Sequence, residues 1–323
     1  MNALDVSIII VSWNTRDLVL QCLASLPAAC EQIKADVWVI DNGSSDGSVQ
    51  AVRDQFPDVH VVANEHNGGF AAANNQGMLK ASGERGQGDR GRQGDKETGR
   101  QGDEQVSNLQ SPISNLQSPI PRYMLLLNSD TVAQPGSIAH LVRFADEHPA
   151  AGMVGLKLIN PDGSFQASFS DAPSLWSEWL NASGLGKRIV GPWYPGYGPR
   201  HSQQARSVDV LPGACMLVRS TAIEQIGLMD EQYFMYSEET DWCMRLRRGG
   251  WQLWYTPDAQ IIHYGGQSTR QMRQAMIEAL YRSKVRFFRK HYGPIYALAL
   301  QSMFAVALRG KWFVDRMRGL RVA

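Results

Sequence analysis

Three carboxylates stand within four positions of the segment FMYSEETDWCMR, residues 234–245. Carboxylates as close as those of Glu238, Glu239 and Asp241 should raise the pKa of at least one of them, which suits a general base. Acidic residues are also favoured at the start of a helix, where the helix dipole stabilises them. The segment therefore predicts either a catalytic cluster or a solvated helix N-terminus.

Two more polar groups each end an apolar run: Asp130 closes LLLNSD, and His263 closes IIH. Mg²⁺ is usually held by one or two carboxylates together with substrate phosphates and water, and neutral imidazole also binds metals. Asn128 could add its carbonyl oxygen. Taken singly, Asp130 is better explained as a turn residue and His263 as a core histidine. Together with the carboxylates of 234–245, they predict a divalent-metal site.

A third set of polar residues suits a nucleoside diphosphate. Asp41 ends the apolar run VWVI and could accept hydrogen bonds from a ribose or a base edge, with an Asx turn as the alternative. Asp46 stands where a helix N-cap belongs. Asn67 and Gly68, in NEHNGGF, open a helix of small residues, and helix N-termini bind phosphate. The chain has no GxxxxGK[ST] loop, and the lack of GxGxxG after the first apolar run excludes a Rossmann dehydrogenase.

The segments between these residues alternate between strand and helix, which predicts an α/β fold with a mostly parallel, doubly wound sheet. The predicted strands are 6–11, 36–41, 59–63 and 123–128, and the predicted helices are 16–26, 46–55, 69–82 and 135–147. Later elements are a strand with a Pro-Gly kink over 208–218, a short helix capped by Ser220 and a helix over 240–249. Ligands bind at the carboxyl ends of strands in such a sheet, so the polar groups should lie together.

Residues 84–121 interrupt this pattern. GRQGD occurs twice between 91 and 103, and SNLQSPI repeats without change over 107–120. The segment has no aromatic residue and nearly balanced charges, so it cannot bury enough apolar surface to offset its ordering entropy. We expect a disordered, low-complexity insertion; a partner-binding loop is the alternative.

The net charge of +1 conceals an uneven distribution. Residues 270–323 carry twelve Lys or Arg against Glu278 and Asp315, a net charge of +10. We expect residues 1–269 to form the main catalytic domain and 270–323 a basic, amphipathic helical extension. The apolar run 298–308 is too short for a bilayer, which needs about 20 residues. The extension is predicted to lie on an anionic membrane surface, with packing on its own domain as the alternative.

Cysteine usage and the N-terminal sequence indicate a location. The four cysteines form no CxxC pair and no zinc-finger spacing, which suits free buried thiols in a reducing compartment. The N-terminal sequence lacks the basic region and cleavage site of a signal peptide. We expect a cytoplasmic protein that is peripheral on the inner face of the cell membrane and has no nucleic-acid partner.

Aromatic residues gather in the second half of the chain. Trp193, Tyr194 and Tyr197 lie in the proline- and glycine-rich segment VGPWYPGYGPR, and Trp176 and Trp179 lie nearby in sequence. Exposed aromatic side chains can stack on sugar rings or contact lipid, whereas buried ones belong to a core. The sequence leaves both interpretations open.

Seven strings in one order resemble family 2 of the inverting glycosyltransferases. They are VSWN, VIDNGSSDGS, NGGFAAANNQG, LLLNSD, GACMLV, LMDEQYFMYSEETDWCMRLRRGGW and IIHYGG. The most similar subgroup contains bacterial rhamnosyltransferases, and the resemblance covers roughly residues 5–290 apart from 84–121. It implies a nucleotide-diphosphosugar-binding fold of the glycosyltransferase A type.

The resemblance also implies roles for individual residues. Asp41 matches the acid that holds the nucleoside, and Asp130 matches the last Asp of a DxD motif that binds Mg²⁺ or Mn²⁺. Asn128 replaces the first Asp of that motif, which weakens metal binding in principle. His263 matches a metal-binding histidine of related galactofuranosyl transferases. Glu239 matches the catalytic base, with Glu in place of the usual Asp.

Other positions in the matching strings complete the expected site. The donor side is expected to include Ser12, Asn14, Asp41, Asn67, Gly68, Asn128 and Asp130. The acceptor-side candidates are Gly213, Ala214, Trp193 and Tyr194. The QxxRW signature of processive synthases is absent, which implies transfer of one sugar per encounter.

The implied reaction is a single displacement that inverts the anomeric carbon of a nucleotide-diphosphosugar, with rhamnose as one candidate sugar. Glu239 would take a proton from a hydroxyl of a saccharide or lipid-linked acceptor, and a metal on Asp130 and His263 would neutralise the diphosphate. Glu238 and Asp241 are the alternatives for the base. A nucleotidyltransferase stays open, although VSWNTRDL lacks the expected glycine- and lysine-rich phosphate loop. An inactive sugar- or lipid-binding scaffold is the third class, against which the intact acidic residues argue.

Overall fold

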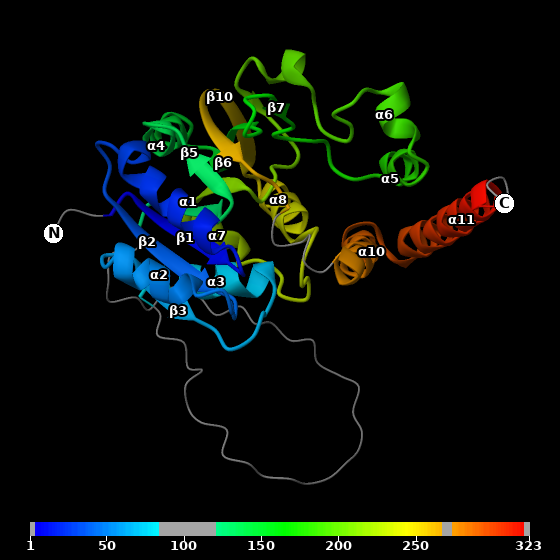
Figure 1. Ribbon diagram of the computed structural model, residues 1–323. Coiled ribbons are helices and arrows are strands. Elements are labelled where there is room, and N and C mark those ends of the chain that lie inside the picture. The colour runs from blue at the N-terminus through cyan, green and yellow to red at the C-terminus, as the bar shows by residue number, and fades with distance from the viewer. Residues whose placement is uncertain (1–3, 84–120, 267–272, 320–323) are drawn as a thin grey trace, which may run out of the picture.

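The structure of the protein is a computed structural model that describes residues 4–83, 121–266 and 273–319 (Figure 1). The described strands form one sheet with the order β3-β2-β1-β4-β9-β6-β10-β5, to which β7 adds beside β6 and β8 beside β10. The strands are β1 (Val6–Ser12), β2 (Ala35–Asp41), β3 (His60–Ala63), β4 (Tyr123–Asn128), β5 (Thr131–Ala133), β6 (Ala151–Ile159), β7 (Phe165–Gln166), β8 (Arg206–Ser207), β9 (Cys215–Arg219) and β10 (Gln252–His263).

Helices flank this sheet on both sides (Figure 1). They are α1 (Arg16–Ala29), α2 (Ser48–Gln55), α3 (Phe70–Ala81), α4 (Ser137–Glu147), α5 (Leu175–Ala182), α6 (Leu185–Ile189), α7 (Ser220–Ile226), α8 (Glu238–Arg248), α10 (Arg273–Tyr292) and α11 (Pro294–Gly319), with a 3₁₀ turn at Pro199–Ser202. One apolar core lies under α1 and α4, and a second lies under α3, α7 and α8. The small residues of α3 permit close packing, since a Cβ on Gly77 would lie 2.4 Å from Ile9.

Parallel pairing brings several strand ends to one edge of the sheet. β1 runs parallel to β2 and β4, with Ser12 opposite Asp41 and Val11 opposite Asn128. β6 and β10 are also parallel to each other, whereas β9 is antiparallel to β4 and β6, and β5 is antiparallel to β10. The predicted mostly parallel α/β sheet is confirmed, and the polar strand ends share an edge.

The elements predicted before residue 150 are all present. The largest departure is α1, which continues from the predicted end at 26 to Ala29 and contains Pro27. Asp46 precedes the observed N-cap of α2 by one residue, yet its Oδ1 still accepts the N–H of Ser48 at 3.0 Å. It therefore satisfies the helix start as expected.

Two later predictions were wrong in detail. The segment 208–218 becomes a strand only from Cys215, because the Pro-Gly kink turns the chain before it can pair with β4 and β6. Ser220 does not cap α7 with its side chain. Its Oγ donates instead to the carbonyl of Pro121 at 2.5 Å and ties the start of α7 to the chain before β4.

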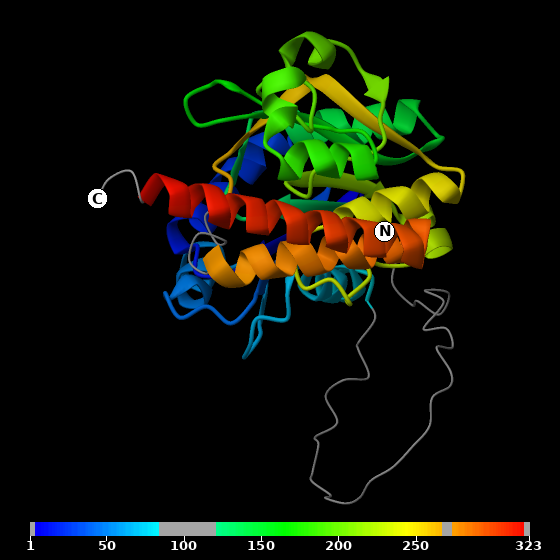
Figure 2. The same cartoon turned by 90° about the vertical axis from the view of Figure 1, so that its right-hand side faces the viewer.

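Helices α10 and α11 run side by side along one flank of the body (Figures 1 and 2). Phe287 and Phe288 of α10 share a small third core with Leu300 of α11 and with Tyr233, which precedes α8. One side of α10 therefore packs on the body. The division of the chain at 269/270 stays a prediction.

The predicted insertion, residues 84–121, lies outside the described residues except for Pro121, which is buried. Within the described ranges, no helix combines the length and the apolar character that crossing a bilayer requires.

Candidate active site

A cavity of about 300 Å³ opens at the carboxyl edge of the sheet. Its walls come from the ends of β1, β4 and β10, the starts of α3 and α8, and the turn before β9. The residues predicted from sequence that line it are Asn67, Asn128, Asp130, Gly213, Ala214, Glu238, Glu239 and His263. Segments far apart in the chain thus meet at one place, as the parallel sheet requires.

Asp130 and His263 face each other in this cavity. Oδ1 of Asp130 lies 3.3 Å from Nε2 of His263, and Nδ1 of His263 lies 2.8 Å from Oε1 of Gln166. The amide of Gln166 donates to Oδ1 of Asn160 at 3.1 Å, and the amide of Asn160 donates to Oγ of Ser164 at 2.9 Å. Because each amide orients the next, Nδ1 of the histidine is the donor to Gln166. In the neutral imidazole, Nε2 then carries no proton.

This arrangement fits a divalent cation. Nε2 of His263 has no hydrogen-bond partner among the described residues, although a carboxylate oxygen lies beside it. Two electron-pair donors without a proton between them suit a metal ion, and the bond to Gln166 holds the ring in place. The described ranges contain no cluster of three or more His, Cys, Asp or Glu side chains able to enclose an ion. Mg²⁺ or Mn²⁺ here would need further ligands from a diphosphate and water.

A strained turn directs the start of α8 into the cavity. Tyr236 and Ser237 have left-handed φ angles of 69° and 68°, which side chains normally disfavour and which concentrate at functional sites. Opposite this turn only glycine fits at position 69, because a Cβ on Gly69 would lie 2.4 Å from the carbonyl oxygen of Phe234. The close approach joins the starts of α3 and α8, and the first carboxylates of α8 reach the cavity.

Burial raises the pKa of both glutamates at this helix start. Glu238 is 3% exposed, and the adjacent charge of Glu239 raises its pKa further. Glu239 is half-buried; desolvation raises its pKa, while hydrogen bonds from Thr240 and the charge of Lys284 oppose the rise. The prediction that clustered carboxylates raise a pKa is confirmed, with burial as the larger cause. A raised pKa closer to neutral pH suits a general base.

The structure corrects the assignment of Asp241 as a candidate base. Two positions beyond Glu239, it lies on the opposite side of α8, is fully buried and does not line the cavity. Its carboxylate pairs with Arg245 at 2.8 Å, Lys290 at 2.8 Å and His291 at 2.7 Å. Burial would raise the pKa of Asp241, but the bond from His291 and the nearby positive charges outweigh it and hold the pKa well below its usual range. Asp241 therefore anchors α10 to α8.

Three of the predicted donor-side residues, Asp41, Asn67 and Gly68, lie at the end of β2 or after β3, and of these only Asn67 lines the cavity. Oδ1 of the buried Asp41 accepts the N–H of Ser44 at 2.8 Å, whereas Oδ2 has no partner among the described residues. The local turn and a ligand role are therefore compatible. Next to it, the amide of Asn42 donates to Oδ1 of Asn67 at 3.0 Å and accepts the N–H of Gly68 at 3.3 Å. These bonds fix the loop that opens α3.

Ser12 and Asn14 take a different part from the one predicted. Oγ of Ser12 lies 3.0 Å from Oγ1 of Thr15 inside the turn after β1, and Oδ1 of Asn14 accepts the N–H of Ser45 at 2.8 Å. Neither residue lines the cavity, whereas Trp13 between them does. Neighbouring side chains at a strand end point in different directions, so VSWN marks the correct loop but not the lining side chain.

A second cavity, of about 230 Å³, adjoins the first. Tyr236 and Glu239 line both cavities, so the Glu239 carboxyl stands on their common wall. The second cavity has hydroxyl, amide and aromatic groups, and α10 forms one of its walls. Its lining includes Ser177, Asn181, Tyr194, Thr240, Lys284 and Phe287.

Three of the four predicted acceptor-side residues divide between these cavities. Gly213 lies in the first, where a Cβ on it would be 4.0 Å from the Cβ of Glu239, and Tyr194 lies in the second. Trp193 lines neither; it is 40% exposed and packs edge-on against Phe165. The aromatic segment thus combines cavity-lining and solvent-facing side chains.

Several lining or supporting residues were not predicted. Trp13 and Asn42 stand inside the matching strings VSWN and VIDNGSSDGS, next to residues that were selected, so local sequence could have indicated them. Gln166 and Lys284 lie in segments without any motif. Only the fold brings them to His263 and to the second cavity.

Comparison with known proteins adds independent findings. The family model described as "Glycosyltransferase like family 2" matches residues 3–286. The N-acetylglucosaminyl-diphospho-decaprenol L-rhamnosyltransferase of Mycobacterium tuberculosis is 30% identical over 254 residues, which cover 76% of this chain and 72% of that protein. The low-salt glycan biosynthesis hexosyltransferase Agl10 of Haloferax volcanii is 23% identical over 259 residues, which cover 80% of this chain and 67% of that protein.

A solved structure agrees at the level of the fold. GalNAc-T7, crystallised with UDP, GalNAc and Mn²⁺, aligns with a TM-score of 0.55 at 14% identity, covering 89% of this chain and 48% of that one. The predicted glycosyltransferase A fold is confirmed, and the nucleotidyltransferase alternative finds no support. Since the family model matches most of the chain, the protein belongs to glycosyltransferase-like family 2 and is a glycosyltransferase.

Proposed function

We propose that this glycosyltransferase moves one sugar, with inversion, from a nucleotide-diphosphosugar to a hydroxyl of a lipid-linked saccharide. The observation that carries the proposal is the position of Glu239 on the wall shared by two cavities. Asp130 and His263 in the first cavity suit a diphosphate and its cation. The second has the mixed polar and aromatic lining expected of a saccharide site. A base between them can reach an acceptor hydroxyl.

Each residue then has a chemical task. Glu239 accepts the proton of the acceptor hydroxyl, and that oxygen attacks the anomeric carbon from the face opposite the diphosphate. Oδ2 of Asp41, which is buried and has no partner among the described residues, would accept a hydrogen bond from the nucleoside. Asp130 and Nε2 of His263 would hold Mg²⁺ or Mn²⁺, which when bound neutralises charge that develops on the leaving diphosphate.

Rhamnose is the donor sugar that we propose, and a lipid diphosphate carrying a saccharide is the acceptor. Support comes from the 30% identical M. tuberculosis relative, whose name specifies rhamnosyl transfer and an N-acetylglucosaminyl-diphospho-decaprenol. The reaction would serve cell-surface polysaccharide or glycolipid synthesis. Because such an acceptor resides in a membrane, we also propose a peripheral position on the inner face of the cell membrane. Residues 1–269 would form the main catalytic domain, and the basic extension 270–323 would add the α10 wall of the second cavity.

The test is product analysis with a panel of donors. The purified protein is incubated with dTDP-rhamnose or UDP-sugars, Mg²⁺ or Mn²⁺, and a lipid-diphosphate-linked N-acetylglucosamine. Mass spectrometry should show addition of a single deoxyhexose, and NMR should show the anomeric configuration opposite to that of the donor. Retained configuration or addition of several sugars would contradict the mechanism. Donor binding without transfer to any lipid-linked acceptor would contradict the acceptor class.

A further inference from the structure

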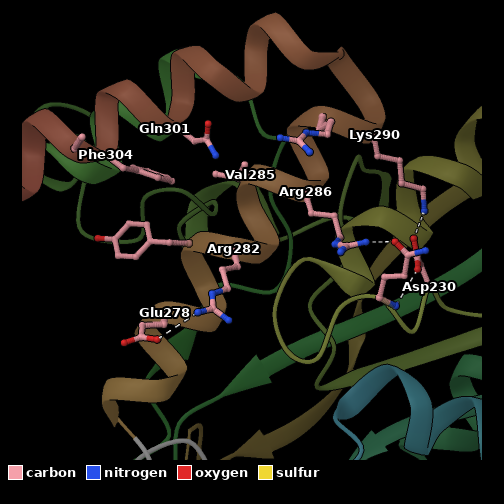
Figure 3. A pocket seen from close by; sticks show the side chains of 12 residues that line it. Asp230, Glu278, Arg282, Val285, Arg286, Lys290, Gln301 and Phe304 are labelled. Carbon is pink, nitrogen blue, oxygen red and sulfur yellow. Dashed lines mark hydrogen bonds and ion pairs between the residues drawn. The ribbon is translucent and has the colours of Figure 1, made fainter. Parts of the chain in front are cut away.

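A third and larger cavity, of about 980 Å³, lies between α10, α11 and the loop before α8 (Figure 3). We term it the C-terminal groove. Arg282, Arg286, Arg289 and Lys290 line it from α10, and Phe304 lines it from α11. It shares no lining residue with the two cavities at Glu239. The groove is therefore a separate feature. Four cations on its α10 wall outnumber the two acids of its lining, Asp230 and Glu278, and Asp230 pairs with Lys290 at 2.6 Å.

The arginines of this wall are poorly neutralised. Arg282, Arg286 and Arg289 recur every three or four residues and so lie along one side of α10. Arg282 meets Glu278 at 3.8 Å with both side chains largely exposed, which makes a weak pair. Arg286 binds the neutral side chain of Gln232, and no described acid forms an ion pair with Arg286 or Arg289. Like charges one helical turn apart repel, so this stripe favours a bound anion.

Helix α11 presents an apolar surface beside the stripe. The sequence has no charged residue from 294 to 308. One side of α11 packs on α10 through Ala297, Leu300 and Phe304. Beside the exposed polar Gln301 and Ser302, several side chains turned to solvent are apolar, with exposed fractions of 80% for Ile295, 64% for Leu298 and 71% for Val306. A solvent-facing apolar helix side beside cations is typical of an interaction surface.

We propose that the C-terminal groove and the exposed side of α11 dock on a membrane that contains anionic lipids. Arg282, Arg286 and Arg289 would bind lipid phosphate groups, while Leu298 and Val306 would enter the headgroup region. Charge complementarity selects this occupant, because a membrane offers negative charge and apolar depth side by side. An acidic soluble partner would match the arginines but not the apolar side of α11.

Docking in this way would orient the active site. Helix α10 separates the two regions: Arg286 faces the C-terminal groove, whereas Lys284 and Phe287 line the second cavity together with Glu239. A helix is about 10 Å across. The second cavity would thus open within about one helix width of the lipid surface. This consequence rests on the proposed function, since it brings a lipid-linked saccharide to Glu239.

The test is flotation of the full-length protein with phosphatidylcholine vesicles, with and without phosphatidylglycerol. The groove variant R282Q/R286Q/R289Q is compared with R53Q/K80Q/R143Q, which removes three exposed cations from α2, α3 and α4. At low salt the groove variant should partition to anionic vesicles roughly 10- to 100-fold less than wild type, and the control variant should match wild type. L298Q/V306Q should keep binding at low salt but lose the salt-resistant part.

Three outcomes would overturn the proposal: equal partitioning to the two kinds of vesicle, equal loss in the groove and control variants, or a vesicle-free dimer that L298Q/V306Q dissociates. The last would mean that a second copy covers α11. All substituted side chains are exposed, so melting temperatures close to wild type should confirm folding. The assay contains no donor or acceptor, so its result does not depend on whether the proposed sugar transfer is correct.

Discussion

Helix α8 meets opposite environments on two sides of its first turns. Toward the cavities, Glu238 and Glu239 are desolvated, and Oε2 of Glu238 has no hydrogen-bond partner among the described residues. Nε2 of His263, which lines the same cavity, is likewise unpartnered in that part of the chain. Toward α10, Asp241 is bound by three side-chain nitrogens within 2.8 Å. The cavity side leaves carboxylate and imidazole atoms without partners, whereas the α10 side pairs both carboxylate oxygens of Asp241 and leaves only Nδ1 of His291 without a partner among the described residues.

The difference shows that partners, more than residue type, decide what a buried carboxylate does. Burial raises the pKa on both sides of α8, but only Asp241 has opposite charges close enough to reverse the shift. An unpartnered buried polar atom costs about 1–3 kcal/mol, so such atoms are tolerated where a ligand can pair with them. A buried carboxylate whose two oxygens are both paired instead makes the neighbouring charges depend on it.

The sharpest test of the cavity side is Glu239→Gln, which keeps the shape and removes the proton acceptor. Turnover should fall by about 10²–10⁴-fold while donor binding is preserved, as measured by product formation and calorimetry. Glu238→Gln is the matched control. It should lose less, because Glu238 lines only the first cavity. A larger loss in the control would transfer the role of base to Glu238.

A substitution on the α10 side of α8, where Asp241 forms its ion pairs, should change the stability of the fold. Asp241→Asn leaves the largely buried Arg245 without its ion pair, while Lys290 keeps Asp230 at 2.6 Å. The change should lower the free energy of unfolding by about 3 kcal/mol, measured by urea denaturation. Asp209→Asn is the control, because Asp209 pairs with Arg247 at 2.8 Å but both side chains are over 30% exposed. That change should cost about 0–1 kcal/mol. Equal losses would mean that the Asp241 cluster adds nothing beyond a surface pair.

The two sides should also have opposite pH dependence. The raised pKa of Glu239 means that the deprotonated base is lost as the pH falls through that value, so turnover should decline up to about tenfold per pH unit there. Stability from Asp241, whose pKa is lowered, is complete above the ordinary aspartate range and is lost as the pH falls below it. The raised pKa values of Glu238 and Glu239 give stability that is lost as the pH rises through them. pH–rate profiles measure the loss of turnover, and urea midpoints at different pH values measure the changes in stability. A fall in turnover centred on the ordinary glutamate pKa would contradict the expected behaviour of Glu239.

Local sequence could predict the strands and the acidic residues of α8, but not which of these carboxylates would be paired. The strands β1 and β4 are continuous apolar runs, which is the pattern of strands buried on both faces, and the three acidic residues of α8 were found by spacing alone. The role of Asp241 depends on His291, fifty positions away in a segment without a motif. The same limit applies to Gln166, because β7 has only two residues and no pattern. Side-chain partners set by tertiary packing leave no local signal.

The smallest expected effect concerns the far wall of the cavity, where Gln166 holds His263. Gln166→Leu removes the acceptor that keeps the proton on Nδ1 of His263, so Nε2 would be unprotonated only part of the time. Mn²⁺ affinity in the presence of a nucleoside diphosphate should fall by about 10–100-fold, as measured by calorimetry or Mn²⁺ spin resonance. Gln166→Glu keeps an acceptor at that place and should retain most of the affinity.

A matched glutamine substitution outside the cavity distinguishes a specific effect on Mn²⁺ affinity from a general effect on the fold. Gln76→Leu removes a glutamine whose amide pairs with Asn64 at 2.9 and 3.0 Å, outside the cavity, and should leave Mn²⁺ affinity unchanged. If Gln166→Leu and His263→Ala both bind Mn²⁺ like the wild type, the unpartnered Nε2 is not a metal ligand. The open polar atoms of the cavity side would then need another explanation. If His263→Ala loses affinity but Gln166→Leu does not, the imidazole binds metal without help from the amide chain, and the positioning role fails by itself.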